Sequence, residues 1–113
     1  EQAMAGFEFY VDDNALDRDD KAMVILKITH NELIDVNVRM YLDRVGEFCD
    51  FLRAENPYLA AGTSANAPAM WEHDEGRLFL MIGADREMWE IALSFQADER
   101  ARLLSAFSGI GAA

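Results

Sequence analysis

The sequence is poor in cysteine and contains no long apolar run. Its single cysteine, Cys49, excludes an internal disulfide and removes any argument for an oxidising compartment. No apolar stretch approaches the ~20 residues that span a bilayer, and nothing resembles a signal peptide. Glycine-rich phosphate loops are missing too, because Gly109 and Gly111 follow the last expected helix rather than open one. We therefore expect a cytoplasmic protein without a membrane partner.

Positive charge is also scarce. The chain has 10 Lys and Arg residues against 21 Asp and Glu residues, a formal net charge of −11. A small soluble domain needs a net charge of only about 2–8 for solubility. Nucleic-acid binding requires the opposite charge, which excludes nucleic acid as a partner. An acidic surface instead raises the association rate with a basic protein, so a basic protein partner is the expectation.

Residues with catalytic or metal-binding chemistry are few. His30 and His73 are the only histidines, both at expected strand ends or turns, and no second histidine lies at a metal-binding spacing. Cys49 borders an apolar stripe and is expected to be a buried, inert thiol. The acidic stretch Asp12–Asp20 lacks the central glycine of a calcium loop. The sequence therefore predicts no enzyme activity, no catalytic residue, no metal and no cofactor.

Length and composition indicate one domain. With 113 residues, of which 51% are hydrophobic, the chain has ample material for a core. Residues 1–6 are expected to be a tag remnant or a flexible start, since Glu1-Gln2-Ala3 precede Met4. Residues 1–113 otherwise form a single domain.

The first half reads as three strands and a helix. Apolar and polar residues alternate over Phe7–Val11 and Ile34–Met40, and Met23–Thr29 is apolar on both faces. Asp12–Asp20, between the expected strands at Phe7–Val11 and Met23–Thr29, is expected to be a solvated loop. From Tyr41 to Glu55 the apolar period changes to that of a helix, which Asn56-Pro57 ends.

The second half repeats this order after a long loop at residues 56–68. Three further strands and a helix capped by Asp98 follow, the strands at Ala69–His73, Arg77–Ile82 and Met88–Gln96. Short turns require antiparallel neighbours. We therefore predict an α+β fold: a two-layer sandwich in βββα-βββα order, with an antiparallel sheet of about six strands and both helices on one face. Trp89, Ile91, Leu93, Phe48 and Leu52 are expected to be buried together.

Two kinds of surface are candidates for partner binding. Carboxylates recur opposite the apolar stripe of the first helix, and others lie at the turn after residue 71; these are Asp43, Glu47, Asp50, Glu72, Asp74 and Glu75. Spacing along the chain does not tell whether they converge. Phe79, Met81 and Met88 are expected on the sheet face away from the helices, where an apolar patch marks an interface such as a homodimer contact.

The chain resembles the small acidic immunity proteins of bacterial toxin–immunity pairs, including those of contact-dependent growth inhibition. The resemblance lies in short length, strong acidity, a lone cysteine, α+β order and the lack of catalytic residues. It implies a cytosolic inhibitor that covers the substrate-binding surface of a cationic toxin domain, often a nuclease, or binds at an adjacent site. Two alternatives remain: a self-associating structural domain that uses the Phe79–Met81–Met88 face, and a small-molecule-binding or enzymatic domain with residues 56–68 as a lid.

Overall fold

The structure, a computed structural model, describes residues 6–54 and 56–110. Residues 1–5 of the expected remnant at residues 1–6, and the predicted helix end at residue 55, lie outside these ranges. In chain order the elements are β1 (Glu8–Leu16), β2 (Ala22–His30), β3 (Ile34–Tyr41), the 3₁₀ turn η1 (Leu42–Arg44), α1 (Val45–Ala54), β4 (Tyr58–Ser64), β5 (Ala67–Asp74), β6 (Arg77–Asp85), β7 (Met88–Phe95) and α2 (Ala97–Ala106).

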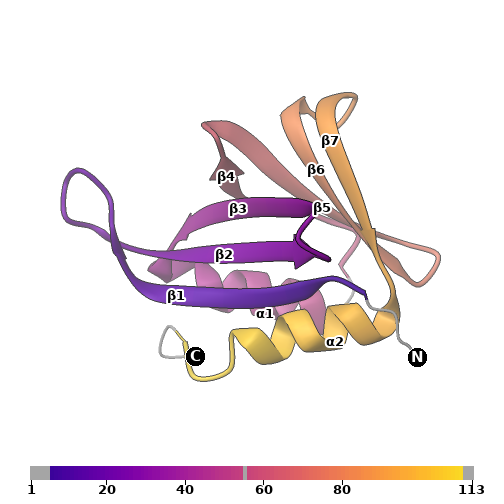
Figure 1. Ribbon diagram of the computed structural model, residues 1–113, viewed down its shortest axis with the longest axis horizontal. Helices are drawn as coiled ribbons and strands as arrows, with labels where there is room; N and C mark the ends of the chain where they lie inside the picture. Colours follow the sequence, from indigo (N-terminus) through magenta and orange to yellow (C-terminus); the bar gives the residue numbers. More distant parts are fainter. Residues whose placement is uncertain (1–5, 55, 111–113) are drawn as a thin grey trace.

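The strands form one antiparallel sheet in sequence order, β1 to β7 (Figure 1). Residues with positive φ sit at the tight turns, among them Asn31 and Glu32 between β2 and β3, and Glu75 and Gly76 between β5 and β6. Figure 1 shows both helices side by side on one face of the sheet. The predicted α+β class and two-helix layer are therefore confirmed, with seven strands rather than about six.

The core lies between the helices and the sheet. Trp71 of β5 is completely buried, and its ring centroid lies 4.7 Å from that of Phe48 in α1. Phe48 also meets Phe107, just after α2, at 5.4 Å. Near one end the sheet curls, so that Phe7 and Phe9 at the start of the chain contact Phe95 at the end of β7. This closure ties β1, β7 and α2 together.

The predicted long loop at residues 56–68 is wrong, because it contains strand β4. Its residues Ala60, Ala61 and Gly62 are poor strand formers, and pairing with β5 overrides their propensity. Gly62 has φ +90°, and a Cβ there would lie 2.7 Å from the Arg39 carbonyl oxygen. Glycine thus allows β4 to approach β3. Among the described residues, Arg39 of β3 and Thr63 of β4 are the single paired position between these two strands. A strand within the sheet cannot act as a lid.

The predicted loop at Asp12–Asp20 is also too long. Strand β1 continues to Leu16, with a register shift between Asp12 and Ala15. Pairing with the apolar strand β2 carries these polar residues into the ladder, because an edge strand tolerates exposed polar side chains. The turn itself is confined to the few residues between Leu16 and Ala22.

Both helix starts differ from the prediction. Tyr41 belongs to β3 and Asp43 to η1, so α1 begins at Val45. The cap of α2 is Gln96 rather than Asp98, in a capping box in which Glu99 accepts a hydrogen bond from the Gln96 N–H at 2.7 Å. Capping boxes normally begin with Ser or Thr, and glutamine at this position does not match that sequence pattern.

The expected burial of Trp89 and Ile91 is wrong, whereas Phe48, Leu52 and Leu93 do lie in the core. Trp89 is 47% exposed and Ile91 42%. Met88 and Glu90 are exposed as well, so a one-residue slip of register does not explain the difference. The reason is a lack of cover: the β6–β7 hairpin rises away from the helix layer in Figure 1.

Candidate partner-binding surface

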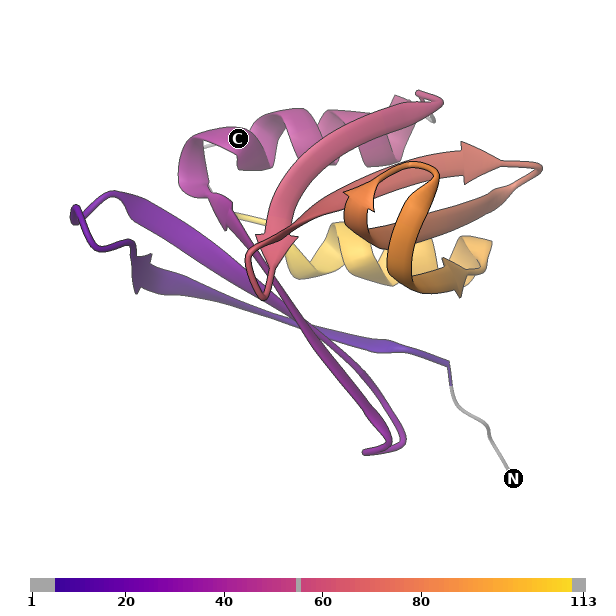
Figure 2. The same ribbon diagram turned by 90° about the horizontal axis from the view of Figure 1, so that it is seen from above.

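The acidic hairpin, defined as residues 12–20, comprises the end of β1 and most of the turn to β2, and it extends beyond both helices in the two views (Figures 1 and 2). It carries five aspartates against one arginine, a net charge of −4. Among the described residues, Asp12, Asp13, Asp19 and Asp20 form no ion pair. Leu16, 61% exposed, stands between these carboxylates. The hairpin is therefore a protruding, uncompensated acidic surface with an apolar residue within it.

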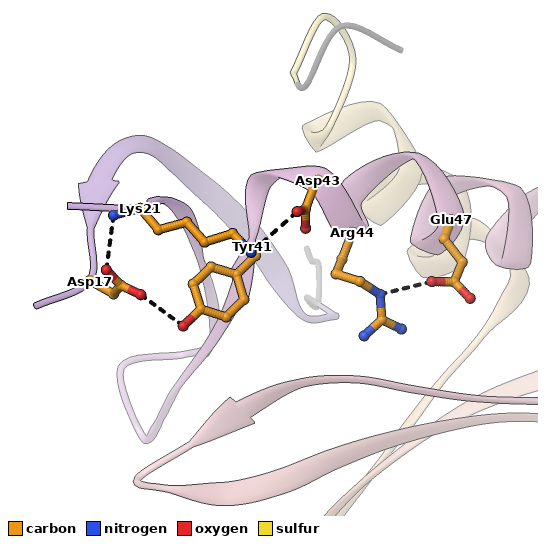
Figure 3. Close-up of polar contacts among 6 residues, drawn as sticks. All are labelled: Asp17, Lys21, Tyr41, Asp43, Arg44 and Glu47. Carbon is orange, nitrogen blue, oxygen red and sulfur yellow. Dashed lines mark hydrogen bonds and ion pairs between the residues drawn. The ribbon is translucent and has the colours of Figure 1, made fainter. Parts of the chain in front are cut away.

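A polar network holds this hairpin against the start of the helix layer (Figure 3). One Asp17 carboxylate oxygen accepts hydrogen bonds from the backbone N–H groups of Asp19 and Lys21, at 2.8 and 2.9 Å. The other accepts from the Tyr41 hydroxyl at 2.8 Å. The Lys21 ammonium lies 3.3 Å from an Asp43 oxygen and 4.3 Å above the Tyr41 ring. The hairpin is thus joined to η1.

Hydrogen bonds in this network shift two pKa values in opposite directions. The Lys21 backbone N–H, followed by the Tyr41 hydroxyl, lowers the pKa of Asp17 below its ordinary value of 3.8. The same carboxylate raises the pKa of Tyr41 above 10.0, because it accepts the proton that tyrosine would lose. Ionised Asp17 and neutral Tyr41 are therefore the stable pair over the whole neutral range.

The titration of Tyr41 gives a direct test of this network. We expect the ring-carbon NMR signal of Tyr41 to titrate at higher pH than that of free tyrosine, and Asp17→Asn to bring it down. The network's stabilisation is lost as pH rises through the folded pKa of Tyr41. It is also lost as pH falls through the folded pKa of Asp17. An unmoved Tyr41 signal in the Asp17→Asn variant would contradict the contact.

The predicted acidic stripe on the first helix is present but locally compensated. Asp43 pairs with Lys21, Glu47 with Arg44 at 2.8 Å, and Asp50 with Arg53 at 3.3 Å. All three carboxylates remain more than half exposed. Arg44 in addition donates to the Ala60 carbonyl of β4 at 2.9 Å. The stripe continues the acidic hairpin across η1, although its own net charge is small.

The other predicted carboxylates lie elsewhere. Trp71 faces the helices, so strand alternation puts Glu72 on the opposite face, where it accepts a hydrogen bond from Arg86 at 2.8 Å. Asp74 ends β5, and Glu75 has φ 52° in the tight turn to β6. The six predicted residues therefore do not form one patch: Glu72 and the helix stripe lie on opposite sides of the sheet.

Sequence reasoning missed Lys21 and Tyr41 as members of this surface. Asp17 and Tyr41 are 24 residues apart, and Tyr41 matched the apolar stripe of the expected helix. No local sequence pattern predicts a contact between a hairpin turn and the end of a later strand, so this contact could not be inferred from the sequence.

The histidines are packing groups rather than free surface residues. The His73 Nε2–H donates to the Phe51 carbonyl at 3.1 Å, and the ring lies 4.6 Å from that of Phe51. His30 packs against Phe7 at 5.1 Å. Both rings are half-buried. Cys49 is buried as predicted, and burial raises the pKa of its thiol.

Over residues 6–54 and 56–110, no group of three or more His, Cys, Asp and Glu side chains is arranged to hold a metal ion. The helices of the same ranges are too short to cross a membrane.

The predicted outer patch is partly formed: Phe79 and Met81 are half-buried on the sheet face away from the helices, and Met88 is 68% exposed.

The fold and this surface define an acidic α+β protein with a projecting hairpin. Comparison with protein-family models, with curated proteins and with solved structures finds no match.

Proposed function

We propose that this protein is a non-catalytic acidic binding protein, an immunity protein that neutralises a cationic, nuclease-type toxin domain by covering its substrate-binding surface. The observation that carries the proposal is the acidic hairpin. It projects from the sheet, and four of its aspartates have no described ion-pair partner. A cleft that binds nucleic acid is lined with Lys and Arg, and free carboxylates complement it.

The network around Asp17 supports the same proposal. A partner-binding loop that is already ordered loses less conformational entropy when it binds. Asp17 uses both oxygens to hold the turn, while Lys21 and Tyr41 join it to η1. The hairpin therefore presents its remaining aspartates from a fixed frame. The stripe formed by Asp43, Glu47 and Asp50 extends this contact surface along α1.

The basic domains encoded in reading frames that flank the gene for this protein provide the test. Each is expressed alone and together with this protein, and growth and direct binding are measured. We expect one such domain to be toxic alone and harmless in a stable complex. If no flanking domain binds, the proposal is wrong.

Charge reversal then locates the interface. Asp13→Lys and Asp19→Lys are expected to slow association with that domain about tenfold each, because they remove attraction and add repulsion. Asp43→Lys and Glu47→Lys test the helix stripe in the same way. Association of the wild type is also expected to slow as salt rises. The measurement is binding kinetics at low and high salt.

Asp98→Lys is the matched control, since it makes the same charge change at the start of α2, the end of the molecule away from the hairpin (Figure 1). Equal slowing by Asp98→Lys would assign the effect to net charge rather than to the hairpin. Association that ignores salt would contradict the electrostatic mechanism.

A further inference from the structure

The outer half of β7 is an uncovered strand edge. Five consecutive residues, Met88–Ala92, are exposed, and the large apolar ones, Met88, Trp89 and Ile91, are 68%, 47% and 42% exposed. Strand β7 is the last strand of the sheet, with β6 as its neighbour on one side. Its other side therefore has unpaired backbone N–H and C=O groups along this run.

Natural edge strands are usually protected by lysine, proline, bulges or a covering element. The register between β6 and β7 is regular from Ile91 to Phe95 of β7 and shifts between Ile91 and Met88, so a bulge lies within the exposed run. At the other end of β7, Phe7 and Phe9 of the first strand close over Phe95. Apart from this bulge and the contact at Phe95, β7 carries no lysine or proline that would block pairing at its edge.

The charges around this edge indicate what kind of segment can bind to it. Glu87 and Glu90 have no ion-pair partner among the described residues, and the Asp85 carboxylate accepts hydrogen bonds from the N–H groups of Glu87 and Met88. A second copy of the chain brings another net charge of −11, and antiparallel pairing centred on Glu90 puts two glutamates opposite each other. A basic segment matches these carboxylates, and the exposed Trp89 ring offers a face for a cation.

We propose that the edge at Met88–Ala92 binds an extended segment of a partner protein, rich in Lys or Arg alternating with apolar residues, which adds to the sheet as an eighth strand. Backbone hydrogen bonds to β7 supply the pairing, Trp89 and Ile91 the apolar contact, and Glu87 and Glu90 the charge. This goes beyond the proposed function, because it concerns a different edge of the molecule and does not depend on the partner being a toxin.

A synthetic probe tests the edge without any partner. The probe is a capped peptide of alternating lysine and valine, about eight residues long, near the usual length of a strand. Its matched control carries the same side chains, with N-methyl groups on the backbone nitrogens that would pair. We expect the probe to slow amide hydrogen exchange at residues 88–92 of the whole protein. The N-methylated peptide is expected to bind about tenfold more weakly or worse, because it lacks the donors for a ladder.

Variants of exposed residues complete the test. Trp89→Ala combined with Ile91→Ala is expected to weaken probe binding about tenfold through the lost apolar contact. Leu33→Ala removes a more exposed apolar residue, 84%, from the β2–β3 turn and is expected to change nothing. Equal binding of the N-methylated peptide, or protection at residues 12–20 instead of 88–92, overturns the proposal. So does a dimer of the free chain in which residues 88–92 are already protected, because the occupant is then a second copy.

Discussion

Replacing Glu99 by alanine is expected to lower the free energy of unfolding by about 3 kcal/mol. Glu99 is the only buried charged residue among those described, 6% exposed. One carboxylate oxygen accepts a hydrogen bond from the Phe7 N–H at 2.7 Å, and the other accepts from the Gln96 N–H at 2.7 Å. Alanine leaves both partly buried donors without an acceptor, and each costs about 1–3 kcal/mol. It also removes one of the two hydrogen bonds by which α2 holds Phe7, and leaves the one from Arg102 to the Phe7 carbonyl.

The measurement is thermal or chemical denaturation, with a fall in melting temperature of roughly 10 °C or more. Asp98→Ala is the matched control, since this neighbouring carboxylate is exposed and lies 3.9 Å from Arg102. It is expected to change stability by about 0.5 kcal/mol or less. Similar losses for both variants would show that the capping box and the Phe7 contact do not anchor the N-terminal strand.

Replacing Gly62 by alanine is expected to cost about 3 kcal/mol, combining a strained backbone with a clash. Gly62 has φ +90°, a conformation that L side chains rarely adopt. The added Cβ would also lie 2.7 Å from the Arg39 carbonyl oxygen and from a methyl group of Val38. Because the oxygen belongs to the backbone of β3, relief requires the two strands to separate. We expect the loss to appear in denaturation, with fast amide exchange at the β3–β4 junction.

Gly46→Ala is the control, and the expected change in its free energy of unfolding has the opposite sign. Gly46 lies in α1, and a Cβ there meets nothing within 4 Å. Alanine in a helix is favoured over glycine by about 1 kcal/mol, so this variant is expected to be more stable than the wild type. Destabilisation by Gly46→Ala, or no effect of Gly62→Ala, would contradict the described backbone at these positions.

The two proposed contact surfaces differ in physical kind. The acidic hairpin acts through charge and is joined to the body by Asp17, Lys21 and Tyr41. The edge at Met88–Ala92 acts through backbone pairing and apolar side chains. Salt therefore separates them: we expect it to weaken the first strongly and the second only in part. Their variants, Asp19→Lys and Trp89→Ala with Ile91→Ala, report on each surface independently.

Residues with clear periodicity disclosed much of the fold. The run Met23–Thr29, apolar on both faces, and the helical stripe of Phe48 and Leu52 predicted elements that the structure contains. Asn31 and Gly76, residue types that tolerate positive φ, lie at short turns of the structure. The antiparallel order and the helix layer then follow from short connections and from apolar faces that must be buried. Of the candidate site, the carboxylates were visible in the sequence.

The sequence by itself determined the features that depend on near neighbours in the chain, namely the apolar periodicity and the turn chemistry. It also determined the total charge. Only the tertiary structure decided that Tyr58–Ser64 is a strand, since its weak propensity is overridden by pairing and by the close approach that Gly62 allows. It likewise decided that Trp89 is exposed, because burial depends on which element covers a residue. The pairing of Asp43 with Lys21 belongs here too. Net charge is a sum over the chain. Whether one charge compensates another depends on the distance between their atoms, which only the folded backbone sets.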